Sequence, residues 1–262
     1  MRPNKRLGQH FLADVNILGR IADALEPEPG ETVIEVGPGH GTLTEVLLAR
    51  GVKVIAIEKD RALAEQLRAR YAVRGEREDI TVIAGDALEL DWHSLPAPRA
   101  PLTAHKIVGN IPYNITSPLL EKALTPPLPE RIVFLVQLEV ARRIAAAPGS
   151  KIYGGLSIGV QAQCRVEVLF TVLPGSFRPP PKVKSALLRL TPLAEPLVRP
   201  EEGAALRVFV AACFSRRRKQ LHNAVPGATA AGLTALGFDP KARPETLAPA
   251  DFVRLLRWSQ QL

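Results

Sequence analysis

The amino-acid sequence predicts an α/β protein in which a Rossmann-like, doubly wound sheet is followed by a small all-α domain. Two patterns carry this prediction. From residue 30 to about residue 190, short β-branched runs alternate with helical segments, which indicates parallel strands joined by crossover helices. After a stretch that contains Pro192, Pro196 and Pro200, only helical segments follow.

Composition limits the class of protein. Of the 262 residues, 46% are hydrophobic and 23% are charged, which is typical of a globular protein and excludes a wholly disordered chain. No apolar run approaches the roughly 20 residues of a membrane span, and no apolar stretch follows the charged N-terminus. Cys164 and Cys213 are too few for a disulfide scaffold or a four-cysteine zinc site. We therefore expect a cytoplasmic protein with reduced thiols, no metal and no membrane partner.

The charge balance indicates the kind of partner that the protein binds. Lys and Arg number 34 against 26 acidic residues, so the net charge is +8. An excess of this size favours a polyanionic partner, most often nucleic acid. The alternative is a surplus of surface charge that serves solubility alone.

The elements of the first part of the chain follow in order. Residues 1–13 form a basic arm, and Asp14 is placed to cap the helix that follows it. The expected strands are 32–36, 52–57, 80–84, 106–108, 131–136, 166–172 and 186–190. Helices are expected over 42–50 and 60–71. The last two strands lack a clear helix between them, so we expect an antiparallel strand at the end of the sheet.

A proline-containing linker over 193–200 separates this part from the rest. Helical segments are expected at 204–214, 219–225, 228–236 and 249–261. The predicted organisation is a basic arm over 1–13, a Rossmann-like domain over 14–192 and a helical domain over 193–262.

The first motif is a glycine turn between a strand and a helix. Gly37, Gly39 and Gly41 follow the strand 32–36, and glycines at such a turn let the backbone approach a ligand. A dinucleotide fingerprint would have its third glycine where Thr42 stands, which disfavours NAD. A plain strand-to-helix turn is the alternative to a ligand site.

Acidic residues close the next two strands. Glu58 ends the second strand, where a carboxylate can accept hydrogen bonds from both ribose hydroxyls of a nucleoside. Asp86 closes the third strand, where a carboxylate can meet an adenine amino group. A glycine turn with these two acids fits an adenosyl ligand that lacks phosphate, which is S-adenosylmethionine.

The second motif follows the fourth strand, where substrate should meet cofactor. Asn110, Ile111, Pro112 and Tyr113 match the Asn/Asp-Pro-Pro-aromatic pattern of amino-methyltransferases, except that Ile111 replaces the first proline. The Asn110 oxygen and a backbone carbonyl can bind the two hydrogens of an exocyclic amine and turn its lone pair toward a methyl donor. Pro112 adds rigidity and Tyr113 offers a face on which a base can stack. A Pro-Tyr turn that caps a strand is the alternative.

Six segments of the chain form a recognisable ordered set: Arg6-Leu-Gly-Gln-His-Phe-Leu, Glu35-Val-Gly-Pro-Gly-His-Gly, Asn110-Ile-Pro-Tyr-Asn, Val136-Gln-Leu-Glu, Phe177-Arg-Pro-Pro-Pro-Lys-Val-Lys-Ser and Phe214-Ser-Arg-Arg-Arg-Lys. Together they resemble one family, the small-subunit ribosomal RNA adenine dimethyltransferases. They cover nearly the whole chain in the family's order, and the ordered set is far more specific than any one piece.

The resemblance implies the transfer of four methyl groups from S-adenosylmethionine to N6 of two adjacent adenosines near the 3′ end of small-subunit RNA. The cofactor contacts that it implies are His10, Leu12, Gly37, Gly39, Glu58, Asp86 and Asn110. His10 stands where many members carry Asn, and a contact through its backbone survives that difference. The target adenine is expected to stack between Tyr113 and Phe177, the one aromatic of a proline-rich loop that should lie on the surface. The alternative is that Phe177 fills the core beneath the loop.

The resemblance also implies the partner, small-subunit ribosomal RNA in a partly assembled 30S-type particle, and we expect the protein to act as a monomer. Arg216, Arg217, Arg218 and Lys219 lie between two expected helices and are the candidates for phosphate contact, a solvated face being the alternative. Two other functions share these features. One is the large-subunit RNA adenine methyltransferase of the macrolide-resistance type, and the other is a non-catalytic RNA-binding assembly factor.

Overall fold

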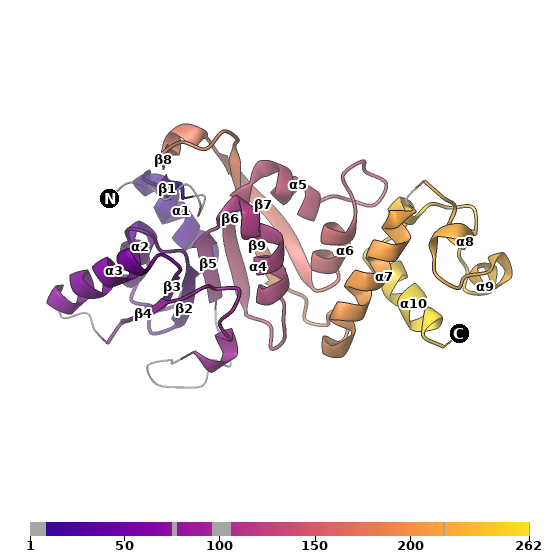
Figure 1. The fold of residues 1–262 in the computed structure, drawn as a ribbon, viewed down its shortest axis with the longest axis horizontal. Helices are drawn as coiled ribbons and strands as arrows, with labels where there is room; N and C mark the ends of the chain where they lie inside the picture. Colours follow the sequence, from indigo (N-terminus) through magenta and orange to yellow (C-terminus); the bar gives the residue numbers. More distant parts are fainter. Residues whose placement is uncertain (1–8, 75–77, 96–105, 217, 262) are drawn as a thin grey trace. The chain divides into compact units, whose positions relative to one another are not determined.

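The computed structural model describes residues 9–74, 78–95, 106–216 and 218–261 (Figure 1). The chain forms two compact units. The first comprises residues 1–141 and 167–191, and the second comprises residues 142–166 and 192–262. Residues 142–166 therefore group with the C-terminal helices, whereas the sequence analysis assigned them to the Rossmann-like domain.

A seven-stranded sheet forms the centre of the first unit, in the order β4-β3-β2-β5-β6-β9-β7. Its strands are β2 (Thr32–Val36), β3 (Lys53–Glu58), β4 (Ile80–Ala84), β5 (Lys106–Asn110), β6 (Arg131–Gln137), β7 (Cys164–Val172) and β9 (Ser185–Pro192). The first five pair in parallel, and β9 runs antiparallel to β6. The expected antiparallel strand exists, but it lies between β6 and β7 rather than at the end of the sheet.

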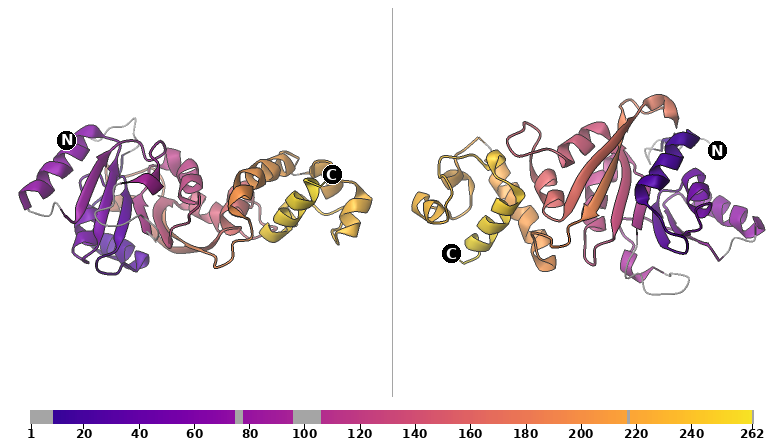
Figure 2. Two further views of the ribbon diagram at one scale, coloured as in Figure 1. Left: turned by 90° about the horizontal axis from the view of Figure 1, so that it is seen from below. Right: turned by 180° about the vertical axis from the view of Figure 1, so that it is seen from behind.

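Helices cover both faces of this sheet. They are α1 (Val15–Leu25), α2 (Thr42–Leu48), α3 (Arg61–Arg74), α4 (Thr116–Ala123) and α5 (Leu138–Ile144), the last of which crosses into the second unit. Figure 1 shows α4 in front of the sheet, and the rear view in Figure 2 shows α1 on the opposite face. Asp14 caps α1 as predicted, because its carboxylate accepts hydrogen bonds from the backbone N–H groups of Asn16 and Ile17. The sequence analysis did not assign α4.

A second, two-stranded sheet was not predicted. It pairs β1 (Phe11–Leu12) antiparallel with β8 (Phe177–Arg178), so that Leu12 lies opposite Phe177. Both side chains are almost fully buried, at 4% and 1% exposure, and belong to the apolar core of the first unit. This pairing holds the N-terminal segment against the end of the β7–β9 connection.

Among the described residues of the second unit, the regular elements are helices, apart from the start of β7 and the last residue of β9. It contains α6 (Gly155–Gln161), α7 (Gly203–Ser215), α8 (Leu221–Ala224), α9 (Ala230–Ala235) and α10 (Pro249–Ser259). It has its own apolar core, in which the Tyr153 hydroxyl donates a hydrogen bond to the Leu247 carbonyl over 2.9 Å. Within the described part of the chain, no helix combines the length and apolarity that crossing a membrane requires.

Candidate active site

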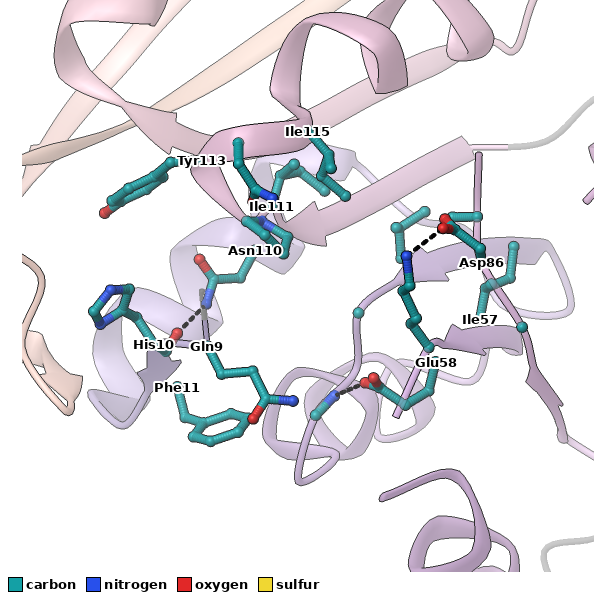
Figure 3. A pocket seen from close by; sticks show the side chains of 18 residues that line it. Gln9, His10, Phe11, Ile57, Glu58, Asp86, Asn110, Ile111, Tyr113 and Ile115 are labelled. Carbon is teal, nitrogen blue, oxygen red and sulfur yellow. Dashed lines mark hydrogen bonds and ion pairs between the residues drawn. The ribbon is translucent and has the colours of Figure 1, made fainter. Parts of the chain in front are cut away.

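One cavity lies at the carboxyl ends of four neighbouring strands of the first unit (Figure 3). Gly37 follows β2, Glu58 ends β3, Asp86 follows β4 and Asn110 ends β5. The strand order reverses at β2: the chain runs outward from β2 through β3 to β4 and then returns to β5, which pairs in parallel with the other edge of β2, with Val36 opposite Gly109. Open α/β sheets bind ligands at such a switch point.

The glycine turn forms the floor of this cavity and requires glycine for two reasons. Gly37 and Gly39 have φ angles of +70° and +58°, which residues with a side chain rarely adopt. A Cβ on Gly39 would also lie 2.8 Å from the ring of Phe11, which packs over the turn. The amide of Gly39 donates a 3.0 Å hydrogen bond to Glu58 Oε2, and this bond ties the turn to the end of β3.

Glu58 is a buried carboxylate on the cavity wall. It is 5% exposed, and it accepts hydrogen bonds from two backbone N–H groups, those of Gly39 and Asp60. Burial raises the pKa of Glu58, and those two N–H groups partly offset the rise. A carboxylate has about four acceptor positions, so capacity remains for the hydroxyls of a bound ligand.

Asp86 follows β4, the strand next to β3, and pairs with Lys59 (Figure 3). Burial raises the pKa of Asp86, but the ion pair with Lys59 and the Leu88 N–H outweigh it, so the pKa lies below the usual value. Asp86 therefore stays ionised at neutral pH as an acceptor for an amino group.

These residues fit an S-adenosylmethionine molecule. A side chain on Gly39 would displace the Phe11 ring, which lines the cavity, and the carboxylates on the wall suit hydroxyl and amino donors. Ile57, Ile111 and Ile115 add apolar surface for a purine. The cationic sulfonium group also complements an acidic cavity, whereas phosphates do not.

Asn110 is held in one orientation at the cavity's edge. Its side-chain Nδ2 donates a 2.7 Å hydrogen bond to the carbonyl of His10, which leaves Oδ1 as the free acceptor (Figure 3). Pro112 lines the same cavity, with φ at −55°. Tyr113 follows, and its hydroxyl lies 2.7 Å from Ser185 Oγ, so the ring is fixed from its far end.

Two of the expected site residues do not reach this cavity. Leu12 and Phe177 are absent from its lining and instead face each other across the β1–β8 pair. The expectation of a surface ring at Phe177 is wrong, because the β1–β8 pairing turns the side chain into the core. The side chain of Leu12 is buried for the same reason, while its carbonyl accepts a hydrogen bond from Thr42 Oγ1.

The structure adds residues that the sequence analysis did not assign. Phe11 lines the cavity, and the centroid of its ring lies 4.3 Å from that of the His40 ring. Gln9, Ile57 and Lys59 also line it. Ile57 and Lys59 flank Glu58 in the sequence, so the end of β3 was the available signal for them. No comparable signal existed for Phe11, because its place depends on the pairing with β8.

The basic run belongs to the second unit. Arg216, Arg218 and Lys219 are exposed, and Arg217 lies outside the described residues. Arg216 Nη1 donates a hydrogen bond to the Asn223 carbonyl over 3.2 Å, which leaves its remaining N–H groups available.

Known proteins resemble this chain over nearly its full length. The family model described as "Ribosomal RNA adenine dimethylase" matches residues 1–261. The "Ribosomal RNA small subunit methyltransferase A" of Hahella chejuensis is 41% identical over 253 residues, which are 96% of this chain and 90% of that protein. A dimethyladenosine transferase from Plasmodium falciparum has a TM-score of 0.81 at 29% identity, covering 96% of this chain and 98% of that one. The 23S rRNA methyltransferase ErmE has a TM-score of 0.66, also at 29% identity, covering 94% and 98%.

Proposed function

Because the chain belongs to the ribosomal RNA adenine dimethylase family, we propose that it dimethylates N6 of two adjacent adenosines near the 3′ end of small-subunit ribosomal RNA. The methyl groups come from S-adenosylmethionine. The observation that carries the proposal is the fixed amide of Asn110 at the edge of an adenosyl-type cavity.

The chemistry follows from the orientation of that amide. The nitrogen of an adenine amino group is a poor nucleophile because its lone pair is delocalised into the ring. Since Asn110 Nδ2 is bonded to the His10 carbonyl, Asn110 Oδ1 is left to accept a hydrogen from the substrate amine. Holding the amine by its hydrogens turns the lone pair out of the ring plane, and Tyr113 supports the base while this happens.

Bound S-adenosylmethionine supplies an electrophilic methyl carbon. The amine that has gained a methyl group is a cation and loses a proton to water readily, so no dedicated general base is needed. The monomethylated amine keeps one hydrogen for Asn110 Oδ1, and the same residue therefore serves the second transfer.

We further propose that the substrate is a partly assembled small subunit and that the protein acts on it as a cytoplasmic monomer. The net charge of +8 and the exposed cations at 216, 218 and 219 support contact with several phosphates. A partly assembled particle offers more such contacts than a short RNA hairpin.

ErmE, a 23S rRNA methyltransferase, has the same fold. Its sequence identity to this chain is 29%, the same as that of the Plasmodium protein. The 41% identity over nearly the whole chain to the small subunit methyltransferase A of Hahella chejuensis favours the small-subunit substrate. A non-catalytic assembly factor would not need the oriented amide of Asn110.

Primer extension on small-subunit RNA from a strain that lacks this activity tests the proposal. Expression of the gene should restore two adjacent stops near the 3′ end, whereas Asn110→Ala should not. Restored stops with the variant refute the role of the amide. Growth on erythromycin without small-subunit stops would assign the protein to the large subunit instead.

A further inference from the structure

The turn that follows β4 is fixed by hydrogen bonds to its own backbone. The Leu90 amide donates a 3.1 Å hydrogen bond to the Asp86 carbonyl. Trp92 Nε1 donates one of 2.8 Å to the Ala87 carbonyl. The backbone of Asp86 therefore has a defined place at the cavity that does not depend on the partners of its side chain.

The carboxylate of Asp86 has one partner on each oxygen. Oδ1 accepts a 3.0 Å hydrogen bond from the Leu88 amide, which belongs to the same turn, and Oδ2 accepts one from the Lys59 ammonium. Figure 3 marks the ion pair at Asp86. An ionised carboxylate has about four acceptor positions, so one position on each oxygen remains for a ligand.

Lys59 comes from the neighbouring strand, directly after Glu58. Its side chain is 56% exposed, whereas that of Asp86 is 14% exposed, and both residues line the cavity. Hydrogen bonding to Asp86 raises the pKa of Lys59, so the ammonium stays charged at neutral pH. An ion pair as open to solvent as this contributes little to folding stability, and we therefore looked for its role at the cavity.

A purine in this cavity would take water away from Asp86. Ile57, Ile111 and Ile115 line the same space, so a base that packs on them brings an apolar surface to the carboxylate. A carboxylate that loses its water without a counter-ion is costly to bury, and it protonates more readily. The Lys59 ammonium compensates that charge in advance, and Lys122 on α4 also lowers the pKa of Asp86 from a greater distance.

We propose that Lys59 is a positioning residue of the cofactor site. Its ammonium holds the Asp86 carboxylate so that a remaining acceptor position meets the adenine amino group, and it balances the charge of Asp86 when the purine displaces water. Lys59 thus acts through Asp86 rather than through its own contact with the adenine. The inference rests on the proposed function only for the identity of the cofactor and for the role of Asp86.

The test removes the ammonium and keeps the rest of the side chain. Lys59→Met retains an unbranched stem, and Lys59→Arg restores a cation that can pair with a carboxylate. Lys53→Met is the matched control, because Lys53 lies at the other end of β3 and outside the cavity lining. Calorimetry measures the affinity of each protein for S-adenosylmethionine and for S-adenosylhomocysteine, which share the adenosine but differ in the charge on sulfur. Urea unfolding of each variant reports on its stability.

For Lys59→Met we expect both ligands to bind about 3- to 30-fold more weakly and to the same extent, with an unchanged urea midpoint. Lys59→Arg should recover most of the affinity, and Lys53→Met should match wild type. In an Asp86→Ala background, whose turn keeps its backbone hydrogen bonds, Lys59→Met should change the affinity by less than about twofold, because the residue through which it acts is gone.

Three results overturn the inference. The first is wild-type affinity in Lys59→Met, and the second is an undiminished loss in the Asp86→Ala background, which would assign the effect to the stem of the side chain. The third is tighter binding of S-adenosylmethionine with unchanged binding of S-adenosylhomocysteine, which would show that Lys59 acts only as a charge near the sulfonium. Failure of the proposed function is a separate result: wild-type protein would bind both ligands and not methylate the small subunit. The affinities are measured without RNA and without methyl transfer.

Discussion

Glu35 should make the stability of this protein fall as the pH rises from acid to neutral. This carboxyl lies on β2 beneath the glycine turn, is 1% exposed, and accepts a hydrogen bond of 2.6 Å from Thr44 Oγ1. Burial raises the pKa of Glu35 from 4.5 to about 7, and the neighbouring Glu58 carboxylate adds to the rise. The folded protein therefore holds a proton here that the unfolded chain releases.

The sign and size of the effect follow from linkage. Between pH 4.5 and about 7 the folded state binds one proton more than the unfolded state, so the free energy of unfolding falls by about 1.4 kcal/mol per pH unit. The stabilisation is complete below pH 4.5 and is lost by the time the pH has passed 7. Over that window the loss amounts to about 3 kcal/mol. Glu35→Gln keeps an oxygen acceptor for Thr44 and removes the titration.

Urea unfolding at intervals from pH 5 to pH 8 measures the pH dependence of the free energy of unfolding. In a Trp258→Phe background, Trp92 is the remaining tryptophan and its fluorescence reports on the first unit. The stability of Glu35→Gln relative to its parent should rise by about 2–3 kcal/mol across that range. Glu65→Gln, which changes an exposed carboxylate on α3, should run parallel to the parent. If the free energy of unfolding of Glu35→Gln also changes with pH as the parent's does, Glu35 is ionised in the folded protein and the reasoning fails.

Three further outcomes are expected. Glu58→Gln should weaken S-adenosylmethionine binding by about 1–3 kcal/mol in calorimetry, because a buried charged acceptor is removed; unchanged affinity would remove Glu58 from the cofactor site. Phe177→Ala should lower the free energy of unfolding by about 3–5 kcal/mol, because the ring is 1% exposed in the core. A variant of normal stability that is defective only in base stacking would instead place the Phe177 ring at the surface. Replacing Arg216, Arg218 and Lys219 with Gln should make particle binding less dependent on salt. The slope of log affinity against log salt concentration should fall by about one unit for each phosphate contact that is lost. An unchanged slope would show that these residues are an ordinary solvated surface.

The sheet could be predicted because its signals are local. Residues 32–36 and 80–84 are strands with the predicted bounds, and the strand expected over 52–57 is shifted by one residue, to Lys53–Glu58. Strands β2 and β3 are buried over nearly their whole length, whereas β4 at the edge of the sheet is only partly buried. All three consist largely of β-branched residues, so neighbouring sequence decides their conformation. The position of β9 between β6 and β7 depends on long-range pairing, which no local pattern encodes.

The same distinction separates the two sides of the cavity. Gly37, Glu58, Asp86 and Asn110 occur at strand ends, and parallel strands bring their carboxyl ends to one edge of the sheet. The burial of Phe177 depends instead on pairing with Leu12, which lies in a distant part of the chain. A proline-rich loop suggests surface, and that local inference failed because two residues of the loop join a strand pair.

The cavity consequently has two kinds of support. The cofactor side of the cavity is formed by the ends of the sheet's strands. There, a 3.0 Å hydrogen bond from the Gly39 amide to Glu58 Oε2 fixes the glycine turn against β3. On the other side of the cavity, His10 Nδ1 donates a hydrogen bond to the Pro179 carbonyl, and the Tyr113 hydroxyl shares one with Ser185 Oγ. A displacement of the segment 179–185 would move both rings while leaving the strand ends in place. We therefore expect changes in the segment 179–185 to shift the two rings with little effect on cofactor affinity.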